Sequence, residues 1–436
     1  MRFISTLGKS REASLEEALF RGLAPDGGLY VPRSLPRFSP EELAELPGAT
    51  WQEMAQAVAG RILRGALDPG VTQRIIRESL DFPLPLKAIS RRTQVLELFH
   101  GPTLAFKDVG ARFMARLMAF FREDDPSPLT ILTATSGDTG GAVAQAFLGL
   151  PGIRVVVLFP DGKVTPRQER QFSTLGRNVH ALGVQGDFDD CQRMVKDVFR
   201  DQGLRREIRL TSANSINVGR LIPQTLYYFL AWARVREAPG REPPSILFTV
   251  PSGNFGNLAA GLMARAMGLP GIRFLAATNA NDRISGYLER GHFQPRPSIP
   301  TLSTAMDVGN PSNLARILHL YGEDLTLLRR DLTSRRVTDQ ETLDTIGRVH
   351  REHGYLMDPH TAVGYHAMEK ELGSEKGAVG VLLATAHPAK FSEVVEPVLD
   401  QEVPIPAELA RCMNQERVVT EMEPEAAALR RFLLHL

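Results

Sequence analysis

The chain has 436 residues, enough for two to four domains at about 100 to 200 residues each. Its hydrophobic fraction of 43% and charged fraction of 23% are those of ordinary globular proteins, which excludes a disordered or fibrous chain. With 51 Lys and Arg against 50 Asp and Glu, the formal net charge is +1, so no overall field attracts nucleic acid or an anionic membrane. Any anion that the protein binds must be held by a local site.

Cysteine usage and the apolar stretches predict where the protein works. Cys191 and Cys412 lie far apart and outside any CxxC pattern, which excludes a disulfide scaffold and a cysteine-based zinc site. No His and acidic residues cluster at metal-ligand spacing, so no metal is expected. The N-terminus lacks the apolar run of a signal peptide, and the stretch 377–386 is about half of the roughly 20 residues that span a bilayer. We expect a cytoplasmic protein with no nucleic-acid or membrane partner.

The first 85 residues are predicted to form a small helical domain. Residues 14–17, Ser-Leu-Glu-Glu, have the pattern of a capped helix start, and apolar residues recur at helical spacing from Trp51 to Leu67. Between them, Leu23 to Pro36 is rich in Gly and Pro and is predicted to be a structured loop. Pro85 marks the predicted end of this domain.

From about residue 95 onward, short runs rich in β-branched residues alternate with longer amphipathic patterns. Strand followed by helix, repeated along the chain, predicts an α/β fold with parallel sheets. The predicted strands are 129–135, 153–159, 179–184, 246–250, 272–278 and 379–385, and the clearest helices are 187–200, 257–267 and 339–353. Parallel sheets bind ligands at the carboxyl ends of their strands, so candidate sites are sought in the loops that follow strands.

The α/β part is predicted to divide into two lobes. Its best linker candidate is Ala238 to Pro244, which contains three prolines and a glycine. The predicted division gives a smaller α/β domain of residues 129–235 and a larger one made of 86–128 and 236–436. The helical domain of residues 1–85 precedes both.

The first loop with ligand-binding character follows the strand predicted at 129–135. Its backbone N–H groups, its hydroxyls and the positive end of the next helix suit a small oxyanion. An ordinary helix cap with a tight turn explains one Ser and one Gly, but it does not require four small polar residues in succession. The candidate substrate-binding residues here are Thr135, Ser136, Gly137 and Thr139. Asp138 stands in the same loop and is considered below as a cofactor neighbour.

A second loop follows the strand predicted at 246–250. Two glycines three residues apart let the backbone curl around an anion, and Ser and Asn side chains complete a cup for phosphate. The loop is neither GxGxxG nor GxxxxGKS/T, which disfavours a dinucleotide site and a P-loop nucleotidase. The residues of this predicted phosphate cup are Ser252, Gly253, Asn254, Phe255, Gly256 and Asn257.

Amine nucleophiles are scarce, because only 8 of the 51 basic residues are lysines. Lys107 follows Leu104, Ala105 and Phe106 and precedes the apolar helical pattern of 111–121, surroundings that would desolvate the amine and lower its pKa. On spacing alone, a solvated lysine in a first helical turn is the more ordinary interpretation. Combined with a phosphate cup and a second oxyanion loop, however, Lys107 supplies what pyridoxal 5'-phosphate (PLP) and an amino-acid substrate need.

The chief rival amine is Lys390. It lies beside Phe391 and Glu393 in what reads as an opening helix turn, where a solvated lysine is expected. His100 and His387 are each next to Gly or Pro and are interpreted as structural.

With these motifs in view, the chain resembles the threonine synthases of the longer form, which have an N-terminal helical domain and share the fold of tryptophan synthase β and the cysteine synthases. The resemblance runs from 23–32 through the lysine segment 98–108 to 385–391, and so covers nearly the whole chain. It implies a two-lobed PLP fold and a PLP-dependent lyase that converts O-phospho-L-homoserine and water to L-threonine and phosphate. The expected assembly is a monomer or homodimer.

The resemblance also assigns roles around the cofactor. It implies that Lys107, next to Phe106, forms the Schiff base and that residues 252–257 hold the cofactor phosphate. Asp138 falls where many relatives place an Asn near the cofactor's phenolic oxygen, and an acidic residue should be less comfortable beside a phenolate. Thr385 matches the hydroxyl residue that faces the pyridine nitrogen; alternatively, it caps the next helix, since Pro388 follows closely.

The segment 212–220 resembles the family's grip on the substrate phosphate, through Asn214, Ser215 and Arg220. Arginine suits this role because it makes paired hydrogen bonds to phosphoryl oxygens. Arg220 could instead be a surface helix residue, one of 43 arginines.

Three other functions remain open on the sequence. A phospho-lyase would act on the same substrate and release 2-oxobutyrate and ammonia. A serine or threonine dehydratase would need no phosphate grip and so no Arg220. A non-catalytic binding protein of the same fold would have no use for Lys107.

Overall fold

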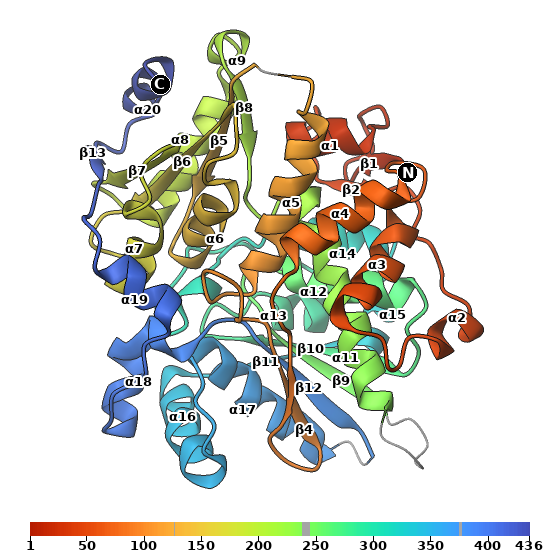
Figure 1. The fold of residues 1–436 in the computed structure, drawn as a ribbon. Helices are drawn as coiled ribbons and strands as arrows, with labels where there is room; N and C mark the ends of the chain where they lie inside the picture. The colour runs from red at the N-terminus through yellow and green to blue at the C-terminus, as the bar shows by residue number, and fades with distance from the viewer. Residues whose placement is uncertain (126, 238–244, 375–376) are drawn as a thin grey trace.

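The computed structural model describes residues 1–125, 127–237, 245–374 and 377–436. Two separate sheets of mainly parallel strands occupy different parts of the molecule, and helices pack around both (Figure 1). This arrangement confirms the predicted α/β class. The linker predicted at Ala238 to Pro244 lies outside the described residues. Within the described ranges, no helix combines the length and the apolar run that crossing a bilayer requires.

The N-terminal region is mostly helical but also contains a small sheet. Its elements are β1 (Phe3–Ser5), α1 (Leu15–Arg21), β2 (Tyr30–Pro32), α2 (Pro40–Ala44), α3 (Trp51–Ile62) and α4 (Pro69–Ser79). The helix start predicted at 14–17 is confirmed, because Ser14 and Glu17 form a reciprocal capping box. Strands β1 and β2 pair antiparallel and were not predicted, because three residues are too few for a periodic signal.

The larger sheet has the strand order β11-β10-β9-β12-β4-β3. Its strands are β3 (Leu86–Ala88), β4 (Thr93–Glu97), β9 (Ile246–Pro251), β10 (Ile272–Thr278), β11 (Leu332–Arg336) and β12 (Val379–Ala384). All neighbouring pairs are parallel except β3 with β4, so the carboxyl ends of the other five strands meet at one edge.

The smaller sheet is wholly parallel, with the order β13-β7-β6-β5-β8. Its strands are β5 (Leu129–Ala134), β6 (Ile153–Pro160), β7 (Val179–Val184), β8 (Arg209–Ser212) and β13 (Thr420–Met422). The segment from Thr420 onward, predicted to belong to the larger domain, instead adds β13 to this sheet, and α20 (Ala426–Leu434) packs on α8 (Phe188–Arg200). That placement depends on a contact between distant segments, which no local pattern shows. The remaining division into domains stays a prediction.

The helices of the α/β part connect these strands. The six strands and three helices predicted with named ranges are confirmed to within one residue at each end. The remaining elements are α5 (Lys107–Phe121), α6 (Asp138–Phe147), α7 (Pro166–Ser173), α9 (Leu204–Glu207), α10 (Val218–Leu221), η1 (Ile222–Thr225), α11 (Leu226–Arg236), α12 (Gly256–Ala266), α13 (Ile284–Arg290), η2 (Thr304–Met306), α14 (Leu314–Leu320), α15 (Leu325–Asp331), α16 (Asp339–His353), α17 (Pro359–Ser374), η3 (Pro388–Phe391), α18 (Ser392–Leu399) and α19 (Ala407–Met413).

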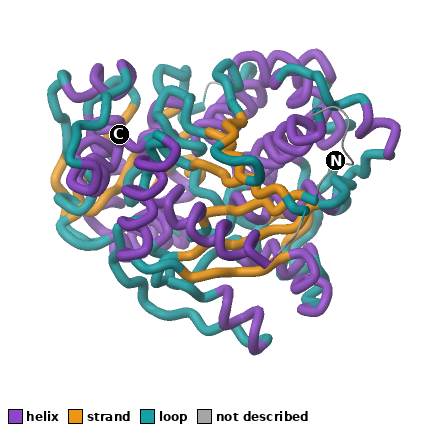
Figure 2. The backbone as a smooth tube through the Cα atoms, turned by 90° about the horizontal axis from the view of Figure 1, so that it is seen from below, coloured by secondary structure: helices purple, strands orange, loops and turns teal. Residues whose placement is uncertain are grey.

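Alternating side chains of the larger sheet face two different cores. Phe248 and Phe274 belong to the cluster that includes α12, whereas their neighbours Leu247 and Leu275 belong to the cluster that includes α17. Because side chains alternate across a strand, these clusters lie on opposite faces, and Figure 2 shows helices on both sides of the strands. Burial on both faces explains why these strands read as continuous apolar runs.

Close packing of α12 on the sheet gives a stability prediction. A Cβ atom added at Gly261 would lie 2.4 Å from Phe274 Cε1 and 2.7 Å from Tyr228 Cζ, and both rings are fully buried. We expect Gly261→Ala to destabilise the fold by about 1 to 3 kcal/mol through overpacking, measured as a lower midpoint in urea unfolding. The matched control is Gly60→Ala in α3, where nothing lies within 4 Å and better helix propensity should hold or raise the midpoint. Equal midpoints for the two variants would contradict the packing argument.

Candidate active site

The segment before α5 brings Lys107 to the carboxyl edge of the larger sheet. Phe106 N donates to Thr385 O at 2.9 Å, and His387 N donates to Leu104 O at 3.1 Å, which docks this segment on the residues that follow β12. Strand β12 pairs with β9, and the predicted phosphate cup follows β9. The amine-bearing helix and the cup therefore meet at the same edge of one sheet.

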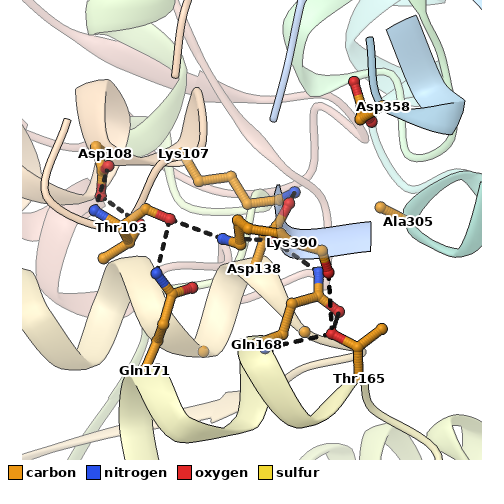
Figure 3. Close-up of polar contacts among 12 residues, drawn as sticks. Thr103, Lys107, Asp108, Asp138, Thr165, Gln168, Gln171, Ala305, Asp358 and Lys390 are labelled. Atoms are coloured by element: carbon orange, nitrogen blue, oxygen red, sulfur yellow. Dashed lines mark hydrogen bonds and ion pairs between the residues drawn. The ribbon is translucent and has the colours of Figure 1, made fainter. Parts of the chain in front are cut away.

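Lys107 is a largely buried lysine. Its side chain is 13% exposed, and its Nζ donates to Asp138 Oδ2 at 3.3 Å (Figure 3). Burial lowers the pKa of Lys107, and the charges of Lys390 and Arg220 lower it further, while Asp138 opposes the shift. The interpretation of Lys107 as a solvated first-turn lysine is wrong for this structure, and the desolvation predicted from its apolar neighbours is present.

Asp138 is an ionised carboxylate at the centre of the site. It is buried, and it accepts from Lys390 Nζ at 2.7 Å and from Gln168 Nε2 at 2.8 Å. Burial alone would raise the pKa of Asp138, but the two lysines and the Gln168 hydrogen bond hold it well below its usual range.

Lys390 is fully buried, so the expectation that it is solvated is wrong. Besides its ion pair with Asp138, its Nζ donates to Thr103 O at 2.7 Å. The sequence around Lys390 looks like an exposed helix start because its carboxylate partner, Asp138, is on a distant segment. In the structure, η3 is held against the start of α7, where Thr165 Oγ1 donates to Lys390 O at 3.3 Å.

The loop between β5 and α6 is shaped by its own side chains. Thr135 Oγ1 accepts from Gly137 N at 2.9 Å and from Gly140 N at 2.8 Å. Gly137 has φ 144°, and an added Cβ there would lie 2.6 Å from the Gln168 side chain, so only glycine fits. Ser136 and Thr139 are partly exposed. Ligand contacts by these residues stay predictions.

The predicted phosphate cup is partly buried, and its backbone is unusual at one residue. Phe255 has φ 58°, a left-handed conformation that is uncommon for a residue with a side chain. An added Cβ at Gly253 would lie 2.8 Å from Ala305 O, so the loop backbone packs closely on η2. The Asn257 Oδ1 atom accepts from the hydroxyls of Tyr227 and Tyr228, both at 2.7 Å.

The cup touches the second predicted receptor. Asn254 Nδ2 donates to Ser215 Oγ at 2.7 Å, so the two loops assigned to phosphate groups lie against each other. Asn214 is used structurally, because its Nδ2 donates to Ala134 O at 2.9 Å and its Oδ1 accepts from Thr133 at 3.1 Å. Of this pair, Ser215 is the better placed to meet a ligand.

Arg220 lies inside the protein, which excludes its interpretation as a surface residue. It is 3% exposed, and its Nη1 donates to Ala213 O at 2.7 Å. Burial lowers the pKa of Arg220 to about 10, so the guanidinium stays charged at neutral pH. Among the buried nitrogen donors that have no acceptor in the described residues are Arg220 Nε and Asn257 Nδ2. Buried donors without acceptors suit an anionic ligand.

The structure adds site residues that the sequence did not indicate. Arg316 is 2% exposed and donates to Ser215 O at 3.0 Å and to Asn313 Oδ1 at 2.6 Å, while Asn313 Nδ2 donates to Asn254 O at 3.0 Å. Burial lowers the pKa of Arg316 to about 9. Arg316, Asn313 and Gln168 do not lie in loops that follow strands. A search limited to such loops therefore does not find them. Lys390 was considered as a rival amine, but its burial and its pairing with Asp138 were not predicted.

Thr385 was predicted either to face the cofactor ring or to cap the next helix, and the residue that caps η3 decides whether the second role is filled. That cap is His387, whose Nδ1 accepts from Ala389 N at 3.1 Å, so the helix-capping alternative for Thr385 has no support. His387 itself is structural in this respect. Thr385 is 7% exposed at the end of β12, on the edge that Lys107 and the cup share.

Comparisons with known families agree with this architecture. A model described as pyridoxal-phosphate dependent enzyme matches residues 83–385. Models described as threonine synthase N terminus and threonine synthase, C-terminal, match residues 2–80 and 361–433. The fold and the larger match define a PLP-dependent enzyme of fold type II.

Similar proteins narrow the class. A threonine synthase of Haemophilus influenzae is 44% identical over 97% of both chains, and that of Escherichia coli strain K12 is 40% identical over all of both. Among solved structures, the PLP-bound threonine synthase from Brucella melitensis has a TM-score of 0.92 at 37% identity and covers 100% of this chain and 99% of that one. The chain belongs to the threonine synthase family, and is thus a PLP-dependent lyase of threonine biosynthesis.

The residues present fit the cofactor of this family. PLP carries an aldehyde, which needs a buried amine, and a phosphate, which needs N–H donors. Lys107 supplies the amine, and the cup supplies backbone amides together with the unmatched Asn257 Nδ2. Which residues hold each part of PLP in this chain remains a prediction.

Proposed function

We propose that the protein converts O-phospho-L-homoserine and water to L-threonine and phosphate, with Lys107 as its catalytic lysine. The observation that carries the proposal is the buried Lys107 amine at the sheet edge that the phosphate cup shares. The threonine synthases that resemble this chain over its full length support the reaction.

The chain's own residues account for binding and proton transfer. Bound PLP would supply an electron sink for the negative charge that develops at the substrate Cα. In its neutral form, the Lys107 amine can take the proton from Cα and later return one to it, because burial lowers its pKa. Loss of a proton from Cβ and of phosphate from Cγ leaves a Cβ–Cγ double bond. A proton is then added at Cγ, water supplies the hydroxyl at Cβ and releases its other proton, and the proton returned to Cα completes L-threonine.

We assign the substrate phosphate to the junction of the two loops. Ser215 lies there against Asn254, and Arg316 places a buried positive charge on the Ser215 carbonyl. Arg220 adds a second buried guanidinium with an unmatched Nε, and Ser136 and Thr139 offer hydroxyls from the loop after β5. An anion held there would offset charges that the described residues leave unpaired.

Product identity tests the function directly. Purified protein supplied with PLP and O-phospho-L-homoserine is expected to release L-threonine and phosphate in equal amounts, measured by chromatography of the amino acid and a phosphate assay. Release of 2-oxobutyrate and ammonia instead would make it a phospho-lyase. Turnover of unphosphorylated L-serine at a comparable rate would indicate a dehydratase. The family relationship favours neither alternative.

Assembly and location are proposals as well. We expect a monomer or homodimer, which light scattering coupled to size-exclusion chromatography would show. A cytoplasmic location, suggested by the scarcity of cysteines, would be tested by cell fractionation. The three-domain division would be tested by limited proteolysis, whose stable fragments should end near the predicted boundaries at residues 85, 128 and 235.

A further inference from the structure

Two lysine side chains flank one buried carboxylate in the active site. The Asp138 carboxylate is in the middle, with Lys107 Nζ 3.3 Å from Oδ2 and Lys390 Nζ 2.7 Å from Oδ1 (Figure 3). The mechanism above uses only Lys107. Lys390 is fully buried, and burying a charged amine is costly unless it is paired and hydrogen-bonded. Lys390 meets both conditions, through Asp138 and through Thr103 O.

The unequal distances indicate which lysine is the partner of Asp138. Lys390 makes the shorter contact, and its other hydrogen bond, to Thr103 O at 2.7 Å, also favours a charged ammonium. Gln168 Nε2 donates to the same Oδ1 atom at 2.8 Å and fixes the carboxylate between α6 and α7. The longer contact at Lys107 leaves that amine the less tightly held of the two.

We propose that Lys390 is a positioning residue that serves as the permanent counter-ion of Asp138 and so leaves Lys107 as a neutral amine, ready to attach PLP. The proposal rests on the proposed role of Lys107 and deepens it. It also explains why an acidic residue is tolerated at 138, since the Asp138–Lys390 pair has no net charge where a neutral Asn would otherwise be expected.

The charged groups around Lys107 either raise or lower its pKa. Asp138 of α6 favours its protonated form, whereas Lys390 of η3 and Arg220 of α10 disfavour it. Asp108, the next residue of α5, is buried and held by Thr103 N at 2.9 Å and Thr103 Oγ1 at 2.6 Å; burial raises its pKa. Removing the charge of Lys390 therefore removes a repulsion from Lys107 and leaves Lys107 as the lysine paired with Asp138. Both effects favour the protonated form of Lys107.

Lys390 also positions the segment that carries Lys107. Its hydrogen bond to Thr103 O fixes the residue before Leu104, which adopts φ 57°. Gln171 Nε2 donates to the same carbonyl at 3.0 Å, so the Thr103 carbonyl keeps an uncharged hydrogen-bond donor when Lys390 is replaced. Loss of the Lys390 charge can thus be separated from loss of the loop's position.

The test uses apoenzyme of the full chain and measures the rate at which added PLP attaches covalently, from visible absorbance across pH. In the parent protein the rate should rise as Lys107 loses its proton. In Lys390→Met, the midpoint is expected to move up by about one pH unit or more, which slows attachment about tenfold at pH values below both midpoints. An unmoved midpoint in a folded Lys390→Met protein overturns the proposal.

Two further variants keep the test informative if Lys390→Met alone does not fold. In Asp138→Asn, Lys107 faces the like charge of Lys390 alone, so the midpoint should fall below that of the parent. Adding Lys390→Met to Asp138→Asn removes both buried charges and should raise the midpoint again; equal midpoints for these two proteins overturn the proposal. The matched control is Lys196→Met, at an exposed lysine of α8, whose midpoint should equal that of the parent.

The outcome also distinguishes this proposal from the proposed function. If PLP attached to a residue other than Lys107 in the parent, shown by mass spectrometry of the reduced protein, the function itself would be misassigned. If PLP attached to Lys107 but the midpoints did not depend on residue 390, only the counter-ion role would fail.

Discussion

Replacing Lys107 with alanine is expected to abolish covalent attachment of PLP and to lower kcat by about 10³-fold or more, because the proposed mechanism uses this one amine as both nucleophile and base. The fold should survive. Asp138 keeps its shorter ion pair with Lys390, so Lys107→Ala leaves no buried carboxylate without a partner. Visible absorbance of the cofactor-loaded protein, steady-state turnover and a circular dichroism melt measure the three effects.

The control for Lys107→Ala is Lys196→Ala, which removes an exposed lysine far from any proposed contact and should change none of the three measurements. Peptide mapping after borohydride reduction should place the cofactor on Lys107 in the parent protein. Turnover of Lys107→Ala at the parental rate, or a label on Lys390, would show that the catalytic amine was misassigned.

Much of this fold is visible in the sequence because each signal is local. Strands such as 153–160 are buried on both faces, so they read as continuous apolar runs, and the capped start of α1 is specified by residues three apart. The short strand β13 is different. Its pairing with β7 joins residues more than two hundred positions apart, and nothing within three residues encodes that partner.

The site divides in the same way. The cup at 252–257 follows a strong strand pattern, so a rule about strand ends finds it. Lys107 is found differently, because lysines are few and this one follows three apolar residues at the start of a helical pattern. For Lys390 the sequence analysis expected a solvated lysine, because its burial against Asp138 arises only when η3 packs on α6 and α7. The site role of Arg316 was not predicted for a related reason. It donates to backbone carbonyls of segments near 30 and 215, and backbone partners leave no pattern of side chains in the sequence.

Replacing Arg220 with alanine is expected to lower kcat/KM for O-phospho-L-homoserine by about 10²-fold, since truncating one partner of a buried charged contact typically costs about 2 to 5 kcal/mol. Because burial lowers the pKa of Arg220 only to about 10, the effect should be constant from pH 6 to about 8. Steady-state kinetics at several pH values, with inorganic phosphate as a competing inhibitor, measure both the loss and the weakened binding of phosphate.

Arg220 also donates to Ala213 O at 2.7 Å, so a structural role must be separated from phosphate recognition. A structural defect would lower the melting temperature and slow every substrate equally, whereas loss of phosphate recognition would leave inhibition by phosphate weak at an unchanged melting temperature. Arg220→Lys keeps the charge but not the paired donors and should recover part of kcat/KM. Full activity of Arg220→Ala on the phosphorylated substrate would remove the phosphate grip from this residue and would reopen the dehydratase, which needs no such grip.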